Sequence, residues 1–164
     1  MFKKWFGNKV DRDVLVSPVS GYLLRIEDVP DPVFSQKLMG EGLAIKPKDG
    51  LIVAPVSGEI VQVADTKHAF GIKTKLGAEL LVHIGLETVA LKGKGFQTFV
   101  SVGDVVNKGD RMVEVDLNYM ENHASSTIIP IVITNSSEET FNFVFENPKD
   151  VIGGETPILT IEKK

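Results

Sequence analysis

The sequence predicts an all-β fold: an antiparallel β-sandwich or a partly closed barrel, with an internal repeat and only short helical turns. Short runs rich in valine, isoleucine and leucine are separated by glycine and proline, of which the chain has 15 and 8. Almost no segment has the helical period of about 3.6 residues over an ordinary helix length. The third observation is a duplication: VLVSPVSGYLLRIEDV, from residue 14, matches LIVAPVSGEIVQVADT, from residue 51.

Each copy of the repeat predicts a short strand, a turn at Pro-x-Ser-Gly and a second, alternating strand. Pro18 corresponds to Pro55, and Gly21 corresponds to Gly58. We therefore expect two similar β units that bury like faces against each other. Between them, residues 31–39 predict one short helical turn before a strand at residues 43–46. The side chains at helix-like spacing, after Pro30 and Pro32, are Val33, Phe34, Lys37 and Leu38.

Two histidines lie in a predicted β-hairpin formed by residues 65–72 and 77–89. A two- or four-residue turn between the strands gives opposed residues whose numbers add up to 151. Opposed Cβ atoms of an antiparallel pair lie about 4.5–5.5 Å apart, so two imidazoles in such a pair share one small ligand. The expected pairs are Phe70 with Leu81, His68 with His83, and Thr66 with Gly85.

The two faces of the second hairpin strand differ in character. Leu80, Val82 and Ile84 alternate with Leu81, His83 and Gly85 along this strand. We expect the first set to face the core and His83 to point the other way, with the glycine leaving room above the sheet.

The rest of the chain predicts one more short helix and further strands. Asp116 is expected to cap a helix over residues 117–124, near whose end His123 has no assigned chemistry. Residues 127–134 are β-branched but contain Pro130, which favours an edge strand or a bulge. Residues 138–145 are ambiguous, and residues 157–162 predict a closing strand. The predicted core consists of Val14, Val16, Leu24, Ile26, Ile45, Val53, Ile60, Val82, Ile84, Val113, Val115, Ile131 and Ile158.

Composition narrows the chemistry. A chain of 164 residues fits one domain, and a net charge of −4 argues against nucleic acid as a partner. There is no cysteine, so histidine is the remaining candidate for a covalent nucleophile. No apolar run is long enough to span a membrane, so we expect a cytoplasmic protein, with residues 1–12 as a flexible tail and residues 13–164 as the domain. The opening MFKKWF gives at most a weak peripheral contact with a membrane.

The run GAELLVHIGLETV at residues 77–89 resembles the phosphorylation-site signature of the glucose-type IIA component of the bacterial phosphoenolpyruvate-dependent sugar phosphotransferase system. The resemblance extends over nearly the whole chain after the first dozen residues. It includes PVSG at Pro18, IEDVPDPVF ending at Phe34, GEGLAIKP at Gly40, TKHAF at Thr66, VALKGKGF at Val89 and GETPIL at Gly154. It implies a single phosphocarrier domain with the predicted β fold.

The resemblance also implies a function for the histidine pair. His83 would accept a phosphoryl group, on its tele nitrogen, from the phosphohistidine of the carrier HPr and pass it to a cysteine of the IIB domain of a sugar permease. His68 would hydrogen-bond the phosphate, and Thr66 would orient His68. No cofactor is implied, and nothing in the sequence requires more than a monomer.

A docking rim is expected around the pair. Asp31 and Glu87 match acidic positions that flank the family site, where they would contact basic residues of HPr or serve as ordinary surface charges. The expected apolar rim consists of Val33, Phe34, Phe70 and Leu81, and Gly85 lies beside it. These four apolar residues fit the core equally well.

Two rival functions remain open. A zinc peptidase of the lysostaphin type uses histidines on neighbouring strands, but the HxH pair is absent, because Leu81 and Gly85 occupy the positions two before and two after His83. His68 and His83 alone make an incomplete zinc site, which a partner protein would have to complete in a complex. The other rival is a regulator that binds its targets through the apolar rim and is switched by phosphorylation.

Overall fold

The computed structural model describes residues 11–138 and 140–164, and this part of the chain is mostly β. The strands are β1 (Arg12–Val16), β2 (Gly21–Arg25), β3 (Glu41–Pro47), β4 (Leu51–Val53), β5 (Gly58–Val63), β6 (Ala69–Lys73), β7 (Glu79–His83), β8 (Phe96–Thr98), β9 (Val105–Val106), β10 (Arg111–Val115), β11 (Ile129–Ile133), β12 (Phe141–Phe145), β13 (Asp150–Val151) and β14 (Pro157–Lys163). The helical elements are η2 (Ile26–Asp28), α1 (Pro32–Ser35), η3 (Thr88–Leu91) and α2 (Leu117–His123).

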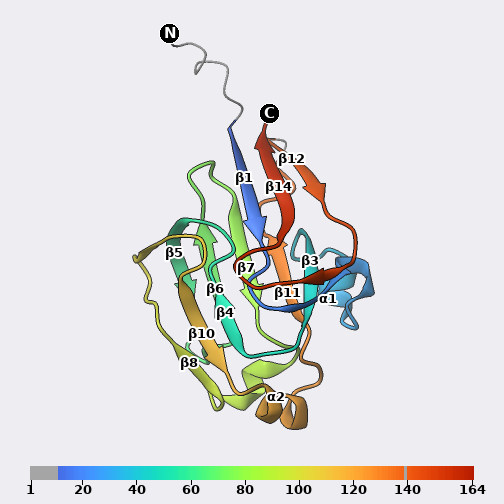
Figure 1. Ribbon diagram of the computed structural model, residues 1–164, viewed down its shortest axis with the longest axis vertical. Coiled ribbons are helices and arrows are strands. Elements are labelled where there is room, and N and C mark those ends of the chain that lie inside the picture. The colour runs from blue at the N-terminus through green and yellow to red at the C-terminus, as the bar shows by residue number, and fades with distance from the viewer. Residues whose placement is uncertain (1–10, 139) are drawn as a thin grey trace.

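The strands form one large sheet and two small ones, and neighbouring strands pair in the antiparallel direction (Figure 1). The eight-stranded sheet has the order β13-β2-β3-β11-β7-β6-β5-β9. The three-stranded sheets have the orders β1-β14-β12 and β4-β10-β8. The sheets do not close into a barrel, so the sandwich alternative of the sequence prediction is confirmed.

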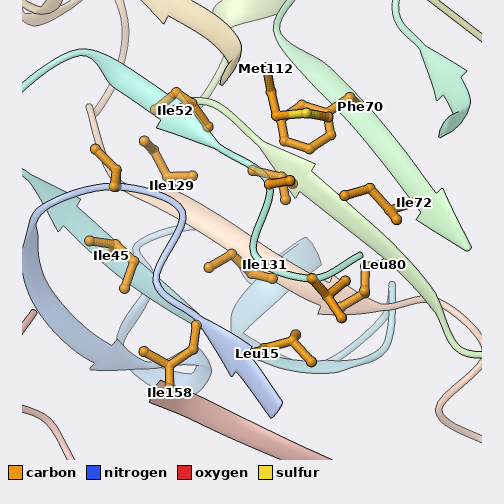
Figure 2. Close-up of a cluster of buried hydrophobic side chains, with 14 of the residues drawn as sticks. Leu15, Ile45, Ile52, Phe70, Ile72, Leu80, Met112, Ile129, Ile131 and Ile158 are labelled. Carbon is orange, nitrogen blue, oxygen red and sulfur yellow. The ribbon is translucent and has the colours of Figure 1, made fainter. Parts of the chain in front are cut away.

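The main core lies between the large sheet and the two small sheets (Figure 2). Leu15 and Ile158 come from one small sheet, Ile52 and Met112 come from the other, and Phe70 comes from the large sheet. Most of the predicted core residues are buried, whereas Val14 and Leu24 are half-buried. A smaller apolar cluster covers the opposite face of the large sheet and consists of Ile26, Val29, Phe34, Ala44, Ala69, Leu81, Leu86 and Val132.

The two copies of the repeat form equivalent units that are hydrogen-bonded to each other. The Val16 N–H donates to the Pro55 carbonyl at 2.9 Å, and the Val53 N–H donates to the Pro18 carbonyl at 2.8 Å. In both copies the Pro-x-Ser-Gly segment connects a small sheet to the large sheet, because β1 pairs with β14 while β2 pairs with β3. The predicted turn therefore crosses between layers.

Both short helices begin where a side-chain cap predicts. Asp31 accepts the N–H of Val33 at 3.0 Å and starts α1, and Asp116 accepts the N–H of Tyr119 at 3.0 Å and starts α2. His123, at the end of α2, hydrogen-bonds the Tyr119 carbonyl and stacks on the Tyr119 ring.

The prediction of an edge strand or a bulge around Pro130 is wrong, since β11 lies inside the sheet and pairs regularly on both sides. Strand β11 lies in the middle of the large sheet, between β3 and β7. The pairing of β11 with β7 covers only Ile131, Val132 and Ile133, so Pro130 lies just beyond that ladder and needs no N–H to join it.

The N-terminal boundary differs slightly from the expected one, because Arg12 already belongs to β1. The aromatic and lysine-rich start that was expected to form a tail lies outside the described residues. Within residues 11–138 and 140–164, no helix combines the length and the apolar character that crossing a bilayer would take.

Candidate functional site

The site is built on the hairpin of β6 and β7, whose register differs by one residue from the predicted one. Lys73 pairs with Glu79 and Ala69 pairs with His83, so opposed residues add up to 152. The cause is a three-residue loop. The Thr74 N–H donates to the Ala78 carbonyl at 2.9 Å, and Gly77 takes a left-handed φ of 95°, which an odd-numbered loop of this kind requires.

The two histidine rings nevertheless lie side by side. Their centroids are 4.9 Å apart and their planes meet at 75°. His68 precedes the first residue of β6 and follows Lys67, whose left-handed φ of 63° bends the chain. The His68 carbonyl accepts the Ile84 N–H at 2.6 Å, which joins this bend to the end of β7. Register alone would have placed His68 opposite Ile84, and the bend brings its ring to the ring of His83.

The hydrogen bond of His83 fixes which ring nitrogen is free. Nδ1 of His83 lies 2.8 Å from the carbonyl oxygen of Gly85. A carbonyl oxygen can only accept, so Nδ1 carries the proton in the neutral ring and Nε2 keeps an unshared electron pair. His83 therefore presents Nε2 as its nucleophilic atom.

His68 is held by a threonine. The Thr66 hydroxyl and Nδ1 of His68 are 2.5 Å apart, and both residues lie in the connection between β5 and β6. A hydroxyl group donates as well as accepts, so this contact orients the ring and leaves Nε2 of His68 directed away from Thr66.

Burial keeps both rings neutral at neutral pH. Desolvation is the largest cause that lowers the pKa of His83 below 6.5, and the hydrogen bond to Gly85 and the negative charge of Asp31 oppose it in part. Desolvation also lowers the pKa of His68 below 6.5, and the nearby positive charge of a protonated His83 lowers it further. A neutral imidazole is the form that can act as a nucleophile.

The connection between β2 and β3 covers one side of the site. The Phe34 ring lies 5.2 Å from the His83 ring, centroid to centroid, and is only 3% exposed, because it also packs in the smaller apolar cluster. Val33, next to it in α1, is 42% exposed. Asp31 is close enough to affect His83 electrostatically. This connection therefore supplies an apolar contact, an exposed apolar side chain and a negative charge.

The other expected rim residues lie in different environments. Phe70 is fully buried in the main core and pairs with Val82, so its assignment to the rim is wrong. The register that placed Phe70 opposite Leu81 is the source of this error. Leu81 is buried in the smaller cluster, on the same face of the sheet as His83. Glu87 is exposed and has a left-handed φ of 58° at the start of η3.

Gly85 is buried, and its lack of a side chain serves packing and the turn. Its φ is 78°, and a Cβ atom there would lie 2.6 Å from Cγ2 of Thr88 and 2.8 Å from Sδ of Met120. The expected opposition of Gly85 to Thr66 is not found, since β6 begins only at Ala69. The Gly85 carbonyl and the Thr88 hydroxyl were not among the predicted site groups. No residue type signals a backbone acceptor such as the Gly85 carbonyl.

Both histidines are half-buried. A groove of about 400 Å³ lies elsewhere, lined by β2, β3 and the connection from β12 to β13, and neither histidine lines it. In the described part of the chain, no three histidine, cysteine, aspartate or glutamate residues are grouped as metal ligands would be. The geometry is that of a paired-imidazole site open to a protein surface.

Comparisons with known proteins identify the family. A sequence model of the phosphoenolpyruvate-dependent sugar phosphotransferase system, EIIA 1, matches residues 13–139. A glucose-specific EIIA component from Halalkalibacterium halodurans is 50% identical over 99% of this chain and 98% of its own length, and one from Staphylococcus epidermidis is 47% identical over 98% of each.

A solved structure gives the same result for the fold. The glucose permease IIA from Mycoplasma capricolum superimposes with a TM-score of 0.84, at 41% sequence identity, over 96% of this chain and 99% of that one. Sequence and fold agree along nearly the full length. The chain belongs to the EIIA 1 family of the phosphoenolpyruvate-dependent sugar phosphotransferase system.

Proposed function

We propose that the chain is a phosphocarrier that receives a phosphoryl group from phospho-HPr on Nε2 of His83 and transfers it to a cysteine of the IIB domain of a sugar permease. Membership of the family supports phosphoryl transfer in sugar uptake. The names of the relatives favour a glucose permease as the acceptor system. We place the transfer in the cytoplasm. The observation that carries the proposal is the hydrogen bond from Nδ1 of His83 to the Gly85 carbonyl, which leaves Nε2 free.

The protein's main tasks in phosphoryl transfer are to position the nucleophile and to stabilise the negative charge. In the first transfer, Nε2 of His83 attacks phosphorus as the N–P bond of the donor breaks, and the donor imidazole recovers its electron pair. The Nδ1 proton stays on His83, hydrogen-bonded to Gly85, so the phosphorylated ring carries a positive charge. When the N–P bond breaks, Nε2 recovers its electron pair and the ring becomes a neutral imidazole, which is a good leaving group. In the second transfer, the cysteine sulfur attacks the same phosphorus and His83 is released.

His68 stabilises the transferred group. Its ring lies 4.9 Å from that of His83, within reach of a phosphoryl group on Nε2. When the Thr66 hydroxyl donates to Nδ1 of His68, the proton of that ring lies on Nε2, where it can be donated to a phosphate oxygen. The negative phosphoryl group also raises the pKa of His68, which favours a charged donor in the phosphorylated state.

The surroundings suit a protein partner. Phe34 and Val33 provide an apolar contact on one side, and Asp31 and Glu87 add negative charge that complements basic groups on HPr. A partner that covers the half-buried histidines excludes water from the phosphohistidine during transfer.

The first prediction concerns the attachment site. Incubation with phosphoenolpyruvate, enzyme I and HPr should label the full chain with an acid-labile, base-stable phosphate, and His83→Ala should remove the label completely. His123→Ala is the matched control, because His123 is exposed on α2, and it should be labelled like the wild type. Labelling that survives in His83→Ala would refute the proposal.

A further inference from the structure

We propose that Thr88 is a positioning residue that holds His83 in its reactive tautomer, by fixing the peptide units to which both histidines are bonded. This inference rests on the proposed function of His83 and adds to it a residue that does not touch the phosphoryl group. Thr88 lies in η3, is 0% exposed, and is one of the few buried polar side chains in the described ranges.

The hydroxyl of Thr88 has a defined partner. It donates to the carbonyl oxygen of Ile84 at 2.6 Å. Ile84 is itself fully buried, so this carbonyl is shielded from water and the hydrogen bond is correspondingly costly to lose.

The Ile84 backbone connects the two histidines. Its N–H donates to the His68 carbonyl at 2.6 Å, and its carbonyl group is joined directly to the nitrogen of Gly85, whose oxygen accepts from Nδ1 of His83. Thr88 therefore anchors the peptide unit that lies between the main-chain contact of His68 and the ring contact of His83.

Packing holds the same turn from behind. Gly85 has a left-handed φ of 78°, and any Cβ there would collide with Cγ2 of Thr88 and Sδ of Met120. The next residue, Leu86, is bonded on both sides to residues that follow α2: its N–H donates to the Ser126 carbonyl at 2.9 Å, and its carbonyl accepts the Ser125 N–H at 3.2 Å. Packing and hydrogen bonds around this turn thus direct the Gly85 carbonyl at His83, and the Thr88 hydroxyl supplies the side-chain hydrogen bond to Ile84.

This arrangement has a chemical consequence. A proton on Nδ1 leaves Nε2 nucleophilic, whereas a proton on Nε2 blocks attack on phosphorus. A hydroxyl that keeps the Gly85 carbonyl in place therefore sets the fraction of His83 that is ready to react.

The test is the imidazole ¹⁵N spectrum of the unphosphorylated full chain at pH 8, where both rings are neutral. The wild type should show His83 with Nδ1 protonated. In Thr88→Val, which keeps the shape but loses the hydroxyl, the two ¹⁵N shifts of His83 should move toward each other as the tautomers mix, and Thr88→Ser should restore them. The initial rate of labelling by phospho-HPr should fall about tenfold in Thr88→Val and recover to within about twofold in Thr88→Ser.

Thr74→Val is the matched control. Thr74 is also buried in this hairpin, and its hydroxyl accepts the Ala78 N–H at 3.2 Å, at the end of the hairpin away from the histidines. This variant should lose stability and keep the His83 tautomer. A wild-type His83 spectrum in Thr88→Val would overturn the proposal, as would an equal shift in Thr74→Val.

Two further outcomes are separable. Thr88→Ala is a second variant without the hydroxyl, and if neither it nor Thr88→Val folds while Thr88→Ser does, Thr88 is structural only and the proposal fails. The spectrum needs no phosphoryl donor, so an unlabelled wild type would contradict the proposed function while leaving the tautomer result to stand by itself.

Discussion

The two halves of the molecule are built alike, yet only one contains the histidine pair. Ile131 of β11 pairs with Val82 of β7 at the centre of the large sheet. Going outward from this pair, β3, β2 and β13 follow on one side, and β6, β5 and β9 follow on the other. On their outer sides, Ile131 pairs with Leu43 and Val82 pairs with Phe70. Ile131 is therefore equivalent to Val82, and Leu43 is equivalent to Phe70. One step further along the central strands, His83 in one half corresponds to the fully buried Val132 in the other.

The halves differ in the connections that leave equivalent strands. The connection from β5 to β6, residues 64–68, is short and carries Thr66 and His68. The equivalent connection from β2 to β3, residues 26–40, is longer and carries Asp31 and Phe34. The short connection places the His68 ring beside His83, and the long connection places the apolar Phe34 ring beside it. The repeated sheet fixes where the site lies, and the unequal connections decide what it can do.

The largest effect is expected from the short connection. His68→Gln keeps a side chain that can donate a hydrogen bond, so phosphate should still enter, but it loses the ring that becomes charged beside the phosphoryl group. Onward transfer to IIB should fall about 10²-fold, because a neutral amide replaces a donor that is charged in the transition state.

The control lies in the other half. Glu41 holds the place equivalent to His68 and forms an ion pair with Lys37 at 3.3 Å. Glu41→Gln should transfer phosphate at the wild-type rate in the same single-turnover assay. Normal onward transfer by His68→Gln would mean that the two connections do not differ in chemistry.

The long connection should affect stability and the pKa of His83. Phe34→Ala removes a buried ring and should lower the free energy of unfolding by about 3 kcal/mol, measured by urea unfolding. It also exposes His83, so the pKa of that ring should rise toward 6.5 in an NMR titration.

The sign of the linked pH effect follows from the lowered pKa. In the wild type, the full stability contributed by neutral His83 is present above about pH 6.5 and is lost as the pH falls toward the folded-state pKa, because the unfolded chain binds the proton first. Phe34→Ala should weaken this dependence, and Phe34→Leu, which keeps an apolar cover, should retain most of it. An unchanged pKa in Phe34→Ala would show that the phenyl ring does not shield His83.

The smallest effect is expected from the charge in the long connection. Asp31→Asn keeps the hydrogen-bond acceptor that starts α1 but removes the negative charge that raises the pKa of His83. The pKa of His83 should therefore fall in low salt, and it should fall less at high salt, where charges are screened. A rise in the pKa, or no salt dependence, would contradict an electrostatic role for Asp31.

Local features of the fold were predictable from the sequence. Alternation placed Leu80, Val82 and Ile84 on the core side of β7, and Asp31 and Asp116 marked the starts of both helices. These features depend on neighbours in the sequence, where period and capping preferences act.

Features that depend on distant pairing were harder to predict. The left-handed Gly77 made the hairpin loop odd-numbered, which shifted the register and sent Phe70 into the core. The central place of β11 depends on β3 and β7 together, and no property of Pro130 indicates that a neighbouring ladder stops short of it. The bend at Lys67, which returns the His68 ring to the site, is a backbone conformation that residue type does not specify.

The pairing of β1 with β14 determines how the domain responds to mechanical force. Arg12 lies opposite Glu162, so the start of one strand and the end of the other meet at the same edge of the molecule (Figure 1). A force that pulls Arg12 and Glu162 apart acts perpendicular to the strands and breaks the hydrogen bonds of the pair one at a time. Strands that are separated in this direction come apart under little force. His83 lies in a different sheet, so the molecule can yield at this edge before tension reaches the ring nitrogen that is proposed to carry the phosphoryl group.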